Sequence, residues 1–341
     1  MSDPFSPRHV LVTGGAGFIG SAFVRSVLAR YPDLRVTVLD KLTYAGNPAN
    51  LAPVAHDPRY RFVQGDITQR DDVLPVLADC DALVNFAAET HVDRSILDAG
   101  AFVTTDVYGS YVLLEATREL RTPRALFVST DEVYGDVPHG ASTEDDAFAP
   151  RSPYAASKAG GELLVRAYHI TYGLPVLTTR GSNTFGPYHY PEKLIPLMVT
   201  NALDEQPLPV YGDGRQRRDW LYVDDHAAGI DAVLRRGVPG AAYNLGGGNE
   251  RENLAVVQSI LDLTGKPASL IRYVQDRPGH DRRYALDCAR AHALGWRPAH
   301  SFEGALAATV RWYQQNEAWW RPLKNGDYAR YYQQQYGSRL P

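Results

Sequence analysis

Four glycines near the N terminus constrain the fold of this chain more than any other feature. Residues 14, 15, 17 and 20 are glycine, and they stand between an apolar run at residues 9–12 and the first expected helix. Glycine permits a tight turn and a close approach of the backbone to a pyrophosphate, and the helix offers amide donors at its N terminus. Asp40 ends the second apolar run, 20 residues after Gly20, where a carboxylate can accept both hydroxyls of an adenosine ribose. The pattern predicts a strand, a turn and a helix that bind a dinucleotide.

Short apolar runs alternate with longer amphipathic stretches through the first half of the chain. The runs are residues 9–12, 35–39, 61–64, 82–86, 125–129 and 175–179. Such alternation is typical of strands in a parallel sheet that are joined by crossover helices. We therefore expect an α/β fold with a doubly wound parallel sheet of the Rossmann type.

The alternation stops after residue 180, where prolines and glycines mark loops. Helical stretches at 253–263 and 302–315 then indicate a second, smaller mixed α/β lobe. We expect residues 1–180 to form a dinucleotide-binding domain, behind a short disordered leader at residues 1–9. Residues 181–341 are expected to form mainly a discontinuous substrate-binding lobe. Strand-like residues at 221–223 and 242–245 predict that the segment 220–248 returns to the first domain.

The composition narrows the partners that the chain can have. Its 341 residues include 35 Lys and Arg against 39 Asp and Glu, a formal charge of −4, so no basic excess points to nucleic acid. The apolar stretch near the N terminus is broken by glycines, which argues against a signal peptide or a membrane span. Cys80 and Cys288 stand singly and far apart, which predicts neither a metal site nor a disulfide and fits the reducing cytoplasm.

The ends of the predicted strands suggest which dinucleotide is bound. Asp40 would repel a 2′-phosphate, which favours NAD over NADP, although Lys41 stands next to it. Asp66 and Ile67 follow the third run, and Ala87-Ala88 follow the fourth. The C-terminal ends of the strands form the edge at which such sheets bind ligands. Asp66 is a candidate ligand of the adenine amine and, equally, a candidate helix cap.

The candidate catalytic groups lie at the end of the fifth run and on the helix expected after it. Thr130, Asp131 and Glu132 follow that run directly. Tyr154 and Lys158 stand four residues apart, so they share one face of a helix, and an ammonium group beside a phenol favours the phenolate that can take a proton from an alcohol. Two adjacent carboxyls can eliminate water if one is kept protonated and the other ionised. The alternative interpretation is a solvated turn acid beside a helix cap.

With these residues the chain resembles the extended short-chain dehydrogenase/reductase family, and within it the branch that removes water from nucleotide sugars. The glycine pattern and Tyr154-x-x-x-Lys158 are shared by many activities of the family. Thr130-Asp-Glu132 and Pro191-Glu-Lys-Leu-Ile-Pro196 are specific to that branch. The resemblance covers nearly the whole chain in order. The matching segments are residues 12–21, 40–47, 87–96, 129–135, 152–158, 186–196, 218–226 and 277–284.

Three positions depart from the pattern of the family. Thr184 stands where a second Asn usually follows Asn183. Asp106 stands where an Asn usually follows Thr105, and Arg180-Gly181 where Arg-Cys or Asn-Cys is common. None of these departures removes a candidate catalytic group.

The resemblance implies a bound NAD, a nucleotide-sugar substrate such as dTDP-glucose, and a homodimer formed through the helices expected at 104–119 and 154–172. To the cofactor site it assigns Gly14, Gly17, Phe18, Ile19, Gly20, Asp40, Lys41, Leu42, Thr43, Asp66, Ile67, Ala87, Ala88, Glu89, Thr105, Tyr154, Lys158 and Thr184. To the substrate site it assigns His91, Thr130, Asn183, Glu192, Lys193, Leu194, Pro209, Tyr211, Arg218, Asn253, Arg277, His280 and Tyr284.

The resemblance also implies a role for each catalytic residue. Tyr154, beside Lys158, takes the proton of the C4 hydroxyl of a hexose while NAD accepts the C4 hydride, and Thr130 holds that oxygen by a hydrogen bond. The C5 hydrogen is then α to a carbonyl, and Glu132 removes it as a base. Asp131 protonates the departing C6 hydroxyl, and the hydride returns to C6.

Two other functions share parts of this pattern. A UDP-sugar 4-epimerase or a decarboxylase uses the same cofactor, Tyr154 and Lys158, but needs no acid pair such as Asp131 and Glu132. A non-catalytic NAD-sensing regulator would be expected to have lost these groups. The sequence leaves open whether the nucleotide is dTDP or UDP, and which pathway the chain serves.

Overall fold

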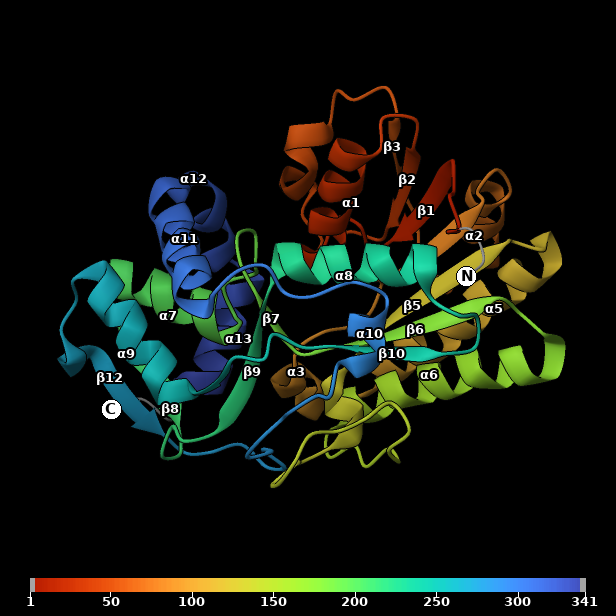
Figure 1. The fold of residues 1–341 in the computed structure, drawn as a ribbon. Helices are drawn as coiled ribbons and strands as arrows, with labels where there is room; N and C mark the ends of the chain where they lie inside the picture. The colour runs from red at the N-terminus through yellow and green to blue at the C-terminus, as the bar shows by residue number, and fades with distance from the viewer. Residues whose placement is uncertain (1–3, 338–341) are drawn as a thin grey trace.

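The computed structural model describes residues 4–337, and its centre is a seven-stranded parallel sheet (Figure 1). Each run predicted as a strand lies in this sheet, so the predicted doubly wound α/β fold is confirmed. In spatial order the strands are β10 (Ala242–Leu245), β6 (Val176–Gly181), β5 (Arg124–Thr130), β4 (Ala82–Asn85), β1 (His9–Thr13), β2 (Arg35–Asp40) and β3 (Tyr60–Gln64).

The strand order reverses next to β1, which pairs with β2 on one side and with β4 on the other. From β1 the chain builds outward to β2 and β3, and then returns to add β4, β5 and β6 on the opposite side. The loops that leave β1 and β4 therefore run in opposite directions, and such a reversal leaves a crevice at the C-terminal ends of the strands. The predicted cofactor residues that follow β1, β2, β3 and β4 meet at this edge.

Helices cover both faces of the sheet, and this explains why its strands are apolar without alternation. Val10 and Val12 of β1 pack with Val27 of α1 and Ile230 of α8 in one buried cluster, and α8 crosses the front of the sheet in Figure 1. Leu11 points to the other face, into a cluster with residues of α2, α5 and α6. These helices are α1 (Phe18–Arg30), α2 (Arg70–Leu77), α5 (Gly109–Leu120), α6 (Pro153–Tyr172) and α8 (Val223–Arg236).

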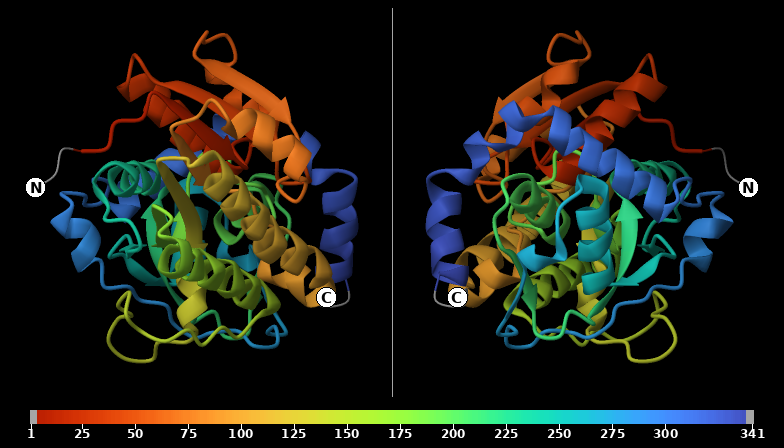
Figure 2. Two further views of the ribbon diagram at one scale, coloured as in Figure 1. Left: turned by 90° about the vertical axis from the view of Figure 1, so that its right-hand side faces the viewer. Right: turned by 90° about the vertical axis from the view of Figure 1, so that its left-hand side faces the viewer.

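A smaller lobe of mixed structure stands beside the C-terminal edge of the sheet (Figures 1 and 2). It has a three-stranded sheet in the order β11, β9, β7 and a two-stranded parallel sheet of β12 and β8. The strands are β7 (Asn183–Phe185), β8 (Leu208–Tyr211), β9 (Arg217–Tyr222), β11 (Glu250–Glu252) and β12 (Ile271–Val274). The helices are α7 (Leu194–Leu203), α9 (Asn253–Thr264), α11 (Phe302–Gln315), α12 (Glu317–Trp320) and α13 (Asp327–Tyr336), and α9 and α11 match the two helices predicted here.

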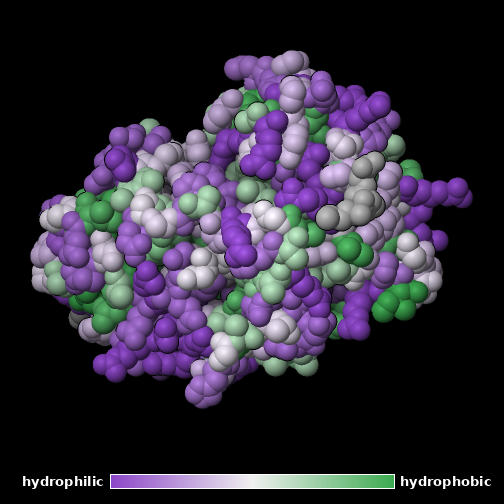
Figure 3. Space-filling view, viewed as in Figure 1, coloured by the Kyte–Doolittle hydropathy of each residue, from purple (hydrophilic) through white to green (hydrophobic). Residues whose placement is uncertain are grey.

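Short elements complete the chain and include a π-helix, η2, ahead of α5. They are η1 (Pro48–Val54), α3 (Val92–Leu97), α4 (Gly100–Phe102), η2 (Val103–Tyr108), η3 (Asp131–Tyr134), η4 (Ala268–Leu270), α10 (Ala289–Ala293) and η5 (Pro322–Lys324). Among the described residues, no helix has the length and apolar character needed to span a membrane. Hydrophilic residues predominate on the face shown in Figure 3, where apolar ones lie in small groups.

Two expectations differ from the structure. The strand expected at 221–223 is the end of β9, which pairs with β7 and β11 rather than joining the central sheet, whereas β10 does pair with β6. The leader expected to be disordered lies partly outside the described residues. Its described part is held in place, because the backbone N–H of Phe5 donates to the Arg235 carbonyl at 2.9 Å and the Phe5 ring lies under Arg124.

A buried ion pair joins β6 of the central sheet to α6, and the same arginine also reaches η3. The Arg180 Nε donates to Glu162 Oε1 at 2.8 Å, and both residues are buried. The same guanidinium donates to the Tyr134 hydroxyl of η3, which in turn donates to Asn244 Oδ1 of β10 at 2.8 Å. Arg180 therefore joins four elements through one guanidinium group.

We expect Glu162→Ala to lower the free energy of unfolding by about 3–5 kcal/mol, because it leaves a buried guanidinium without its carboxylate. Glu119→Ala is the matched control. Its carboxylate pairs with Arg70 at 2.7 Å on the surface, so its loss should cost less than about 1 kcal/mol. Thermal and denaturant unfolding measure both variants, and equal losses would contradict the assignment of Arg180 as a buried anchor.

Candidate active site

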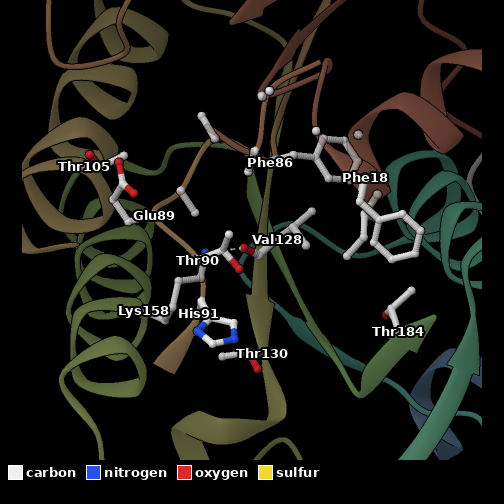
Figure 4. A pocket seen from close by; sticks show the side chains of 18 of the residues that line it. Phe18, Phe86, Glu89, Thr90, His91, Thr105, Val128, Thr130, Lys158 and Thr184 are labelled. Carbon is white, nitrogen blue, oxygen red and sulfur yellow. Dashed lines mark hydrogen bonds between the residues drawn. The ribbon is translucent and has the colours of Figure 1, made fainter. Parts of the chain in front are cut away.

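A continuous cleft runs between the C-terminal edge of the central sheet and the smaller lobe. It consists of two adjoining cavities, a first of about 300 Å³ and a second of about 150 Å³. Figure 4 shows the first cavity, with Phe18 and Phe86 toward one end and Lys158, His91 and Thr130 toward the other. The two cavities share the residues His91, Val92, Glu132, Asn183, Glu192 and Lys193.

The glycine turn at the start of α1 forms part of the wall of the first cavity. Gly14 has φ +69°, and a Cβ atom there would lie 2.4 Å from the backbone N of Ala87. Only glycine fits between these two segments of backbone. Gly17 precedes α1 and makes no side-chain capping bond, so the first amides of the helix remain available to an anion.

Asp40 is held in a fixed orientation at the end of β2. One carboxylate oxygen accepts from the Ala16 N–H at 2.9 Å and the other from the Leu42 N–H at 2.8 Å. Burial raises the pKa of Asp40, while these two amide donors lower it. Leu42 does not line the cavity, so this amide bond is the contribution that the structure shows for it.

Lys41 points away from Asp40. Its ammonium forms an ion pair with Asp66 at 2.7 Å, so its positive charge is committed to another carboxylate. Asp66 also accepts from the Thr68 N–H at 2.9 Å and lines the first cavity. It does not cap α2, whose N-cap residue is Gln69 and has no side-chain capping bond. The presence of Lys41 beside Asp40 had weakened the preference for NAD over NADP. Because Asp66 pairs with the Lys41 ammonium, that lysine is no argument for a 2′-phosphate.

Thr130 and the acid pair of Asp131 and Glu132 lie where β5 ends and η3 begins. The Thr130 hydroxyl donates to Asp131 Oδ1 at 3.2 Å and accepts from the Glu132 N–H at 3.3 Å. Asp131 is buried, and within residues 4–337 no group hydrogen-bonds its second oxygen. All three residues line the first cavity, and Glu132 lines both.

The two adjacent carboxyls stand in different electrostatic surroundings. Burial raises the pKa of Asp131 well above its ordinary value, and the carboxylates of Glu132 and Asp219 raise it further. Burial also raises the pKa of Glu132, but the nearby cations Arg277, Arg218 and Lys193 oppose that rise. Of the two carboxyls, Asp131 is therefore the one whose protonated form is favoured more strongly.

Tyr154 and Lys158 occupy the first turns of α6, as their spacing predicts. Ser152 caps this helix by accepting from the Ala155 N–H at 3.1 Å. The Lys158 ammonium donates to the Val128 carbonyl at 2.8 Å. Burial raises the pKa of Tyr154 well above its ordinary value, and the carboxylate of Glu132 raises it further. The pKa of Tyr154 therefore lies above that of a free phenol, in contrast to the expectation that Lys158 favours the phenolate.

Asp106 places a buried carboxyl behind the catalytic helix. It accepts from the Ser157 hydroxyl at 2.6 Å and from the Glu89 N–H at 3.2 Å, so it joins η2, α6 and the loop after β4. Burial raises its pKa to about 6, against the opposing charge of Lys158. These bonds give a structural role to a residue for which the sequence offered none.

The second cavity collects positive charge. Arg277 donates to Asp93 Oδ1 at 2.9 Å, and Lys193 donates to the Thr90 hydroxyl at 2.9 Å. Arg218 is buried, donates to the Asp281 carbonyl at 2.9 Å and lies 4.3 Å above the Tyr284 ring. Such a set of fixed cations can bind a diphosphate, for which guanidinium groups are well suited.

The structure brings nearly all the candidate residues to this cleft. The exceptions are Leu42 and Tyr284, which line neither cavity, and Tyr284 instead supports Arg218 from behind. Thr184 lines the first cavity with its hydroxyl 2.7 Å from His226 Nδ1. Over the described residues, no cluster of His, Cys, Asp and Glu could hold a metal ion. Lining residues that sequence reasoning missed include Phe86, Thr90, Asp93, Val128, His189, Gln216 and Tyr336.

Some of these missed residues carried a signal in the sequence. Phe86 directly follows β4, and Val128 lies in β5, two residues before its end, so both are near the edge where lining residues are expected. Thr90 and Asp93 lie inside the segment 87–96 that carried part of the resemblance. His189 stacks on Phe18 with ring centroids 4.0 Å apart, and no pattern in the sequence indicates that contact.

Known proteins resemble this chain over most of its length. The family model described as GDP-mannose 4,6 dehydratase matches residues 11–309. A dTDP-glucose 4,6-dehydratase of Streptomyces niveus is 53% identical over 94% of this chain and 97% of that protein. One from Neisseria meningitidis serogroup B is 51% identical, again over 94% of this chain and 97% of that protein.

Solved structures show the same similarity. A dTDP-glucose 4,6-dehydratase from Streptomyces venezuelae, DesIV, crystallised as a double mutant with NAD bound, superposes with a TM-score of 0.91 at 53% identity, covering 92% of this chain and 99% of that one. A UDP-glucuronic acid 4-epimerase from Bacillus cereus, also with NAD, has a TM-score of 0.85 at 28% identity over 90% of this chain and 99% of that one.

We expect Asp106→Asn to change how stability depends on pH. The folded-state pKa of Asp106 is raised from 3.8 to about 6, so its contribution to stability is present below pH 4 and is lost as the pH rises through 6. Asn cannot ionise, so between pH 4 and pH 7 the variant should gain up to about 3 kcal/mol relative to the parent. Thermal unfolding across this range measures the gain. Asp71→Asn, an exposed change, is the control, and parallel curves for Asp106→Asn and the parent would contradict the expectation.

Proposed function

The chain belongs to the GDP-mannose 4,6 dehydratase family, and on that premise we propose that it is an NAD-dependent hydro-lyase that converts dTDP-glucose to dTDP-4-keto-6-deoxyglucose. The observation that carries this proposal is the acid pair of buried Asp131 and half-buried Glu132, which line the first cavity together with Tyr154, while Glu132 also lines the second. The reaction oxidises C4, eliminates water across C5 and C6, and reduces C6.

The first cavity suits NAD. The glycine turn and the first amides of α1 would hold the pyrophosphate, and the fixed carboxylate of Asp40 would accept the ribose hydroxyls. When bound, NAD would supply the acceptor for the C4 hydride and return that hydride to C6. Burial and the neighbouring carboxylates raise the pKa of Tyr154, and the hydrogen bond with Thr130 lowers it.

Oxidation at C4 uses the groups at the inner end of the first cavity. Tyr154 accepts the proton of the C4 hydroxyl, and Thr130 lies close enough to hydrogen-bond the Tyr154 hydroxyl and lower its pKa. Lys158 is anchored by the Val128 carbonyl, which fixes its ammonium on the same helical face as Tyr154. Together these residues hold the C4 hydroxyl while its oxygen loses a proton and the C4 carbon loses a hydride.

Elimination uses the two carboxyls in opposite protonation states. Glu132, kept ionised by the cations of the second cavity, removes the C5 proton, which is acidic once C4 is a ketone. Asp131, kept protonated by burial, gives its proton to the C6 hydroxyl, which leaves as water. After its proton has exchanged with water, Glu132 returns a proton to C5 as the hydride reaches C6, so the net change is the loss of one water.

The second cavity suits the nucleotide diphosphate. Arg218 and Arg277 are placed to bind the diphosphate, and Lys193 lies where it can reach the sugar or the phosphate. Tyr211 lines the far part of this cavity, where its ring can stack on the pyrimidine base. Glu192 pairs with Arg94 at 2.8 Å and is left with one oxygen for a sugar hydroxyl.

A 4-epimerase of the same fold is the second candidate, because it shares the cofactor site, Tyr154 and Lys158. The acid pair favours the dehydratase, since epimerisation needs no group to protonate a departing C6 hydroxyl. A regulator that senses NAD is disfavoured because Tyr154, Lys158 and both carboxyls all face the cleft.

We propose residues 1–180 with the returning segment 223–248 as the NAD-binding domain, because residues 220–222 of the expected segment belong to β9, which pairs with β7 and β11. Residues 181–341 outside that segment form the substrate lobe, whose last four residues lie outside the described chain. The buried, unpaired Cys80 and Cys288 support a cytoplasmic location.

A homodimer through α5 and α6 is supported by an exposed apolar face. α5 and α6 pack against each other and lie on one side of the molecule (Figure 2, left). Their outward face, with η2, exposes the large side chains Val103, Tyr108, Tyr111, Leu163, Ile170 and Tyr172. A second copy of the chain fits this face, because the same two helices from each subunit would bury it in a two-fold interface.

We expect Asp131→Asn and Glu132→Gln each to lower turnover of dTDP-glucose by about 10²- to 10⁴-fold, because each removes a proton-transfer group. The two variants should differ in kind. Glu132→Gln should still show NADH absorbance on mixing with substrate but lose exchange of the C5 hydrogen with deuterated water, whereas Asp131→Asn should retain that exchange. Asp145→Asn, on an exposed loop, is the control.

The parent protein decides between the candidate functions in the same assay. Loss of one water from dTDP-glucose with no net NADH supports the dehydratase, and parallel reactions with UDP-glucose report the base preference. Galactose isomers without loss of water would support the epimerase. No turnover of either sugar by protein that binds NAD would support the regulator.

We expect Leu163→Glu to convert the dimer to a monomer, because it would place two carboxylates in an apolar two-fold interface. Light scattering after size exclusion measures the mass. Val238→Glu is the control, since Val238 is 63% exposed and lies outside α5 and α6. A monomeric parent, or a Leu163→Glu variant that stays dimeric, would contradict the proposed interface.

A further inference from the structure

The last described helix, α13, packs along the second cavity with one face of tyrosines (dark blue in Figure 2). Tyr328, Tyr331 and Tyr336 are buried, at the spacing of one helical face. Tyr336 lines the second cavity itself. The helix therefore belongs to the wall of the nucleotide site, although it lies far along the chain from every residue assigned to that site.

Gln335 is the one amide on this buried face, and it is only 6% exposed. A buried amide is unfavourable unless it is hydrogen-bonded, so its partner shows what it contributes. Its Nε2 donates to the Tyr211 hydroxyl at 2.6 Å. Tyr211 stands 124 residues earlier in the chain, so this bond fastens the helix to the base end of the cavity.

The Tyr211 hydroxyl is a node of a buried network. It accepts from Gln335, lies 3.3 Å from the Tyr336 hydroxyl, and donates to Asp93 Oδ2 at 2.9 Å. The Tyr331 hydroxyl also reaches Asp93 Oδ2, at 3.3 Å. With its hydroxyl held on three sides, the Tyr211 ring cannot turn away from the orientation in which it faces the cavity.

The network continues from Asp93 to the cation of the diphosphate site. Asp93 Oδ1 accepts from Arg277 Nη1 at 2.9 Å. Burial raises the pKa of Asp93, but His91 and Arg277 outweigh it and hold that pKa at about 2, so Asp93 is an anion at neutral pH. In the described part of the chain no group accepts from Arg277 Nε, although this guanidinium lines the cavity. One carboxylate thus orients both Tyr211 and Arg277.

We propose that Gln335 and Tyr336 of α13 are positioning residues for nucleotide recognition. Gln335 orients the Tyr211 ring toward the base and, through Tyr211 and Asp93, the Arg277 guanidinium toward the diphosphate. This inference rests on the proposed function, because it assumes that the second cavity holds a nucleoside diphosphate. It assigns the C-terminal helix to binding of the nucleotide and not to the chemistry at C4, C5 or C6.

The test compares Gln335→Met, which keeps the volume but removes the donor, with Gln334→Met on the exposed face of the same helix. Steady-state kinetics with dTDP-glucose, and calorimetric titration with dTDP alone, measure binding separately from chemistry. For Gln335→Met we expect KM for dTDP-glucose and Kd for dTDP to rise together by about five- to tenfold, with kcat within twofold of the parent. Gln334→Met should match the parent in all three.

A second variant tests the direction of the hydrogen bond. Gln335→Glu is close to Gln in shape, but a carboxylate can only accept, so it would draw the Tyr211 proton away from Asp93. We expect its KM to rise at least as far as that of Gln335→Met. Unchanged KM and Kd in both variants would overturn the inference. A lower kcat together with a lower melting temperature, but an unchanged Kd for dTDP, would also overturn the inference. That result would show that the helix only stabilises the fold.

Failure of the proposed function is visible separately in the parent protein. A parent that binds dTDP but does not dehydrate dTDP-glucose would remove the proposed reaction, and the ratio of Kd values between Gln335→Met and the parent would still decide the role of α13. A parent that binds no dTDP would overturn both.

Discussion

The close approach of two backbone segments at the reversal of strand order determines where everything else in this protein can lie. Gly14, after β1, meets Ala87, after β4, so tightly that a Cβ atom would come within 2.4 Å of the Ala87 nitrogen. This contact joins the two halves of the sheet while their loops diverge, and the crevice that results is the first cavity. The carboxylate of Asp40 and the catalytic end of β5 face the same crevice because all the strands are parallel. A bulkier side chain at this one position would separate the edges on which both the cofactor site and the acid pair depend.

Burial and nearby cations give two neighbouring carboxyls different pKa values. Asp131 and Glu132 are adjacent in sequence and share the cleft. Arg277, Arg218 and Lys193 all oppose the rise in the pKa of Glu132, whereas Arg218 opposes the larger rise in the pKa of Asp131. In the proposed function, the cations assigned to the nucleotide would therefore also oppose the rise in the pKa of Glu132, the proposed base. Binding and chemistry are coupled by electrostatics across the cleft, and this explains why the acid pair lies where the two cavities meet. Asp106 shows the same balance behind α6, because burial raises the pKa of its carboxyl while the charge of Lys158 lowers it.

Much of the fold could be predicted because the strands are buried on both faces and read as unbroken apolar runs. The strand β9 was only partly predicted, because its sequence, Arg-Arg-Asp-Trp-Leu-Tyr, begins with charges that serve the cleft and its walls. Local patterns and the family resemblance located most of the candidate residues that line the cleft, but they missed others, among them Phe86, His189 and Tyr336. They could not show that Lys41 turns to Asp66, or that Gln335 reaches Tyr211, because such contacts depend on tertiary packing rather than on spacing. The pKa of Tyr154 was beyond the sequence for the same reason, since burial outweighs one nearby ammonium group.

The edge strand β10 has a consequence for how the chain is made. It pairs with β6, yet the chain between them first passes through β7, β8 and β9 of the smaller lobe and then through α8, which covers one face of the central sheet. During synthesis the ribosome must therefore release residue 245 before the cofactor domain can close, and Leu177 of β6 remains uncovered until then.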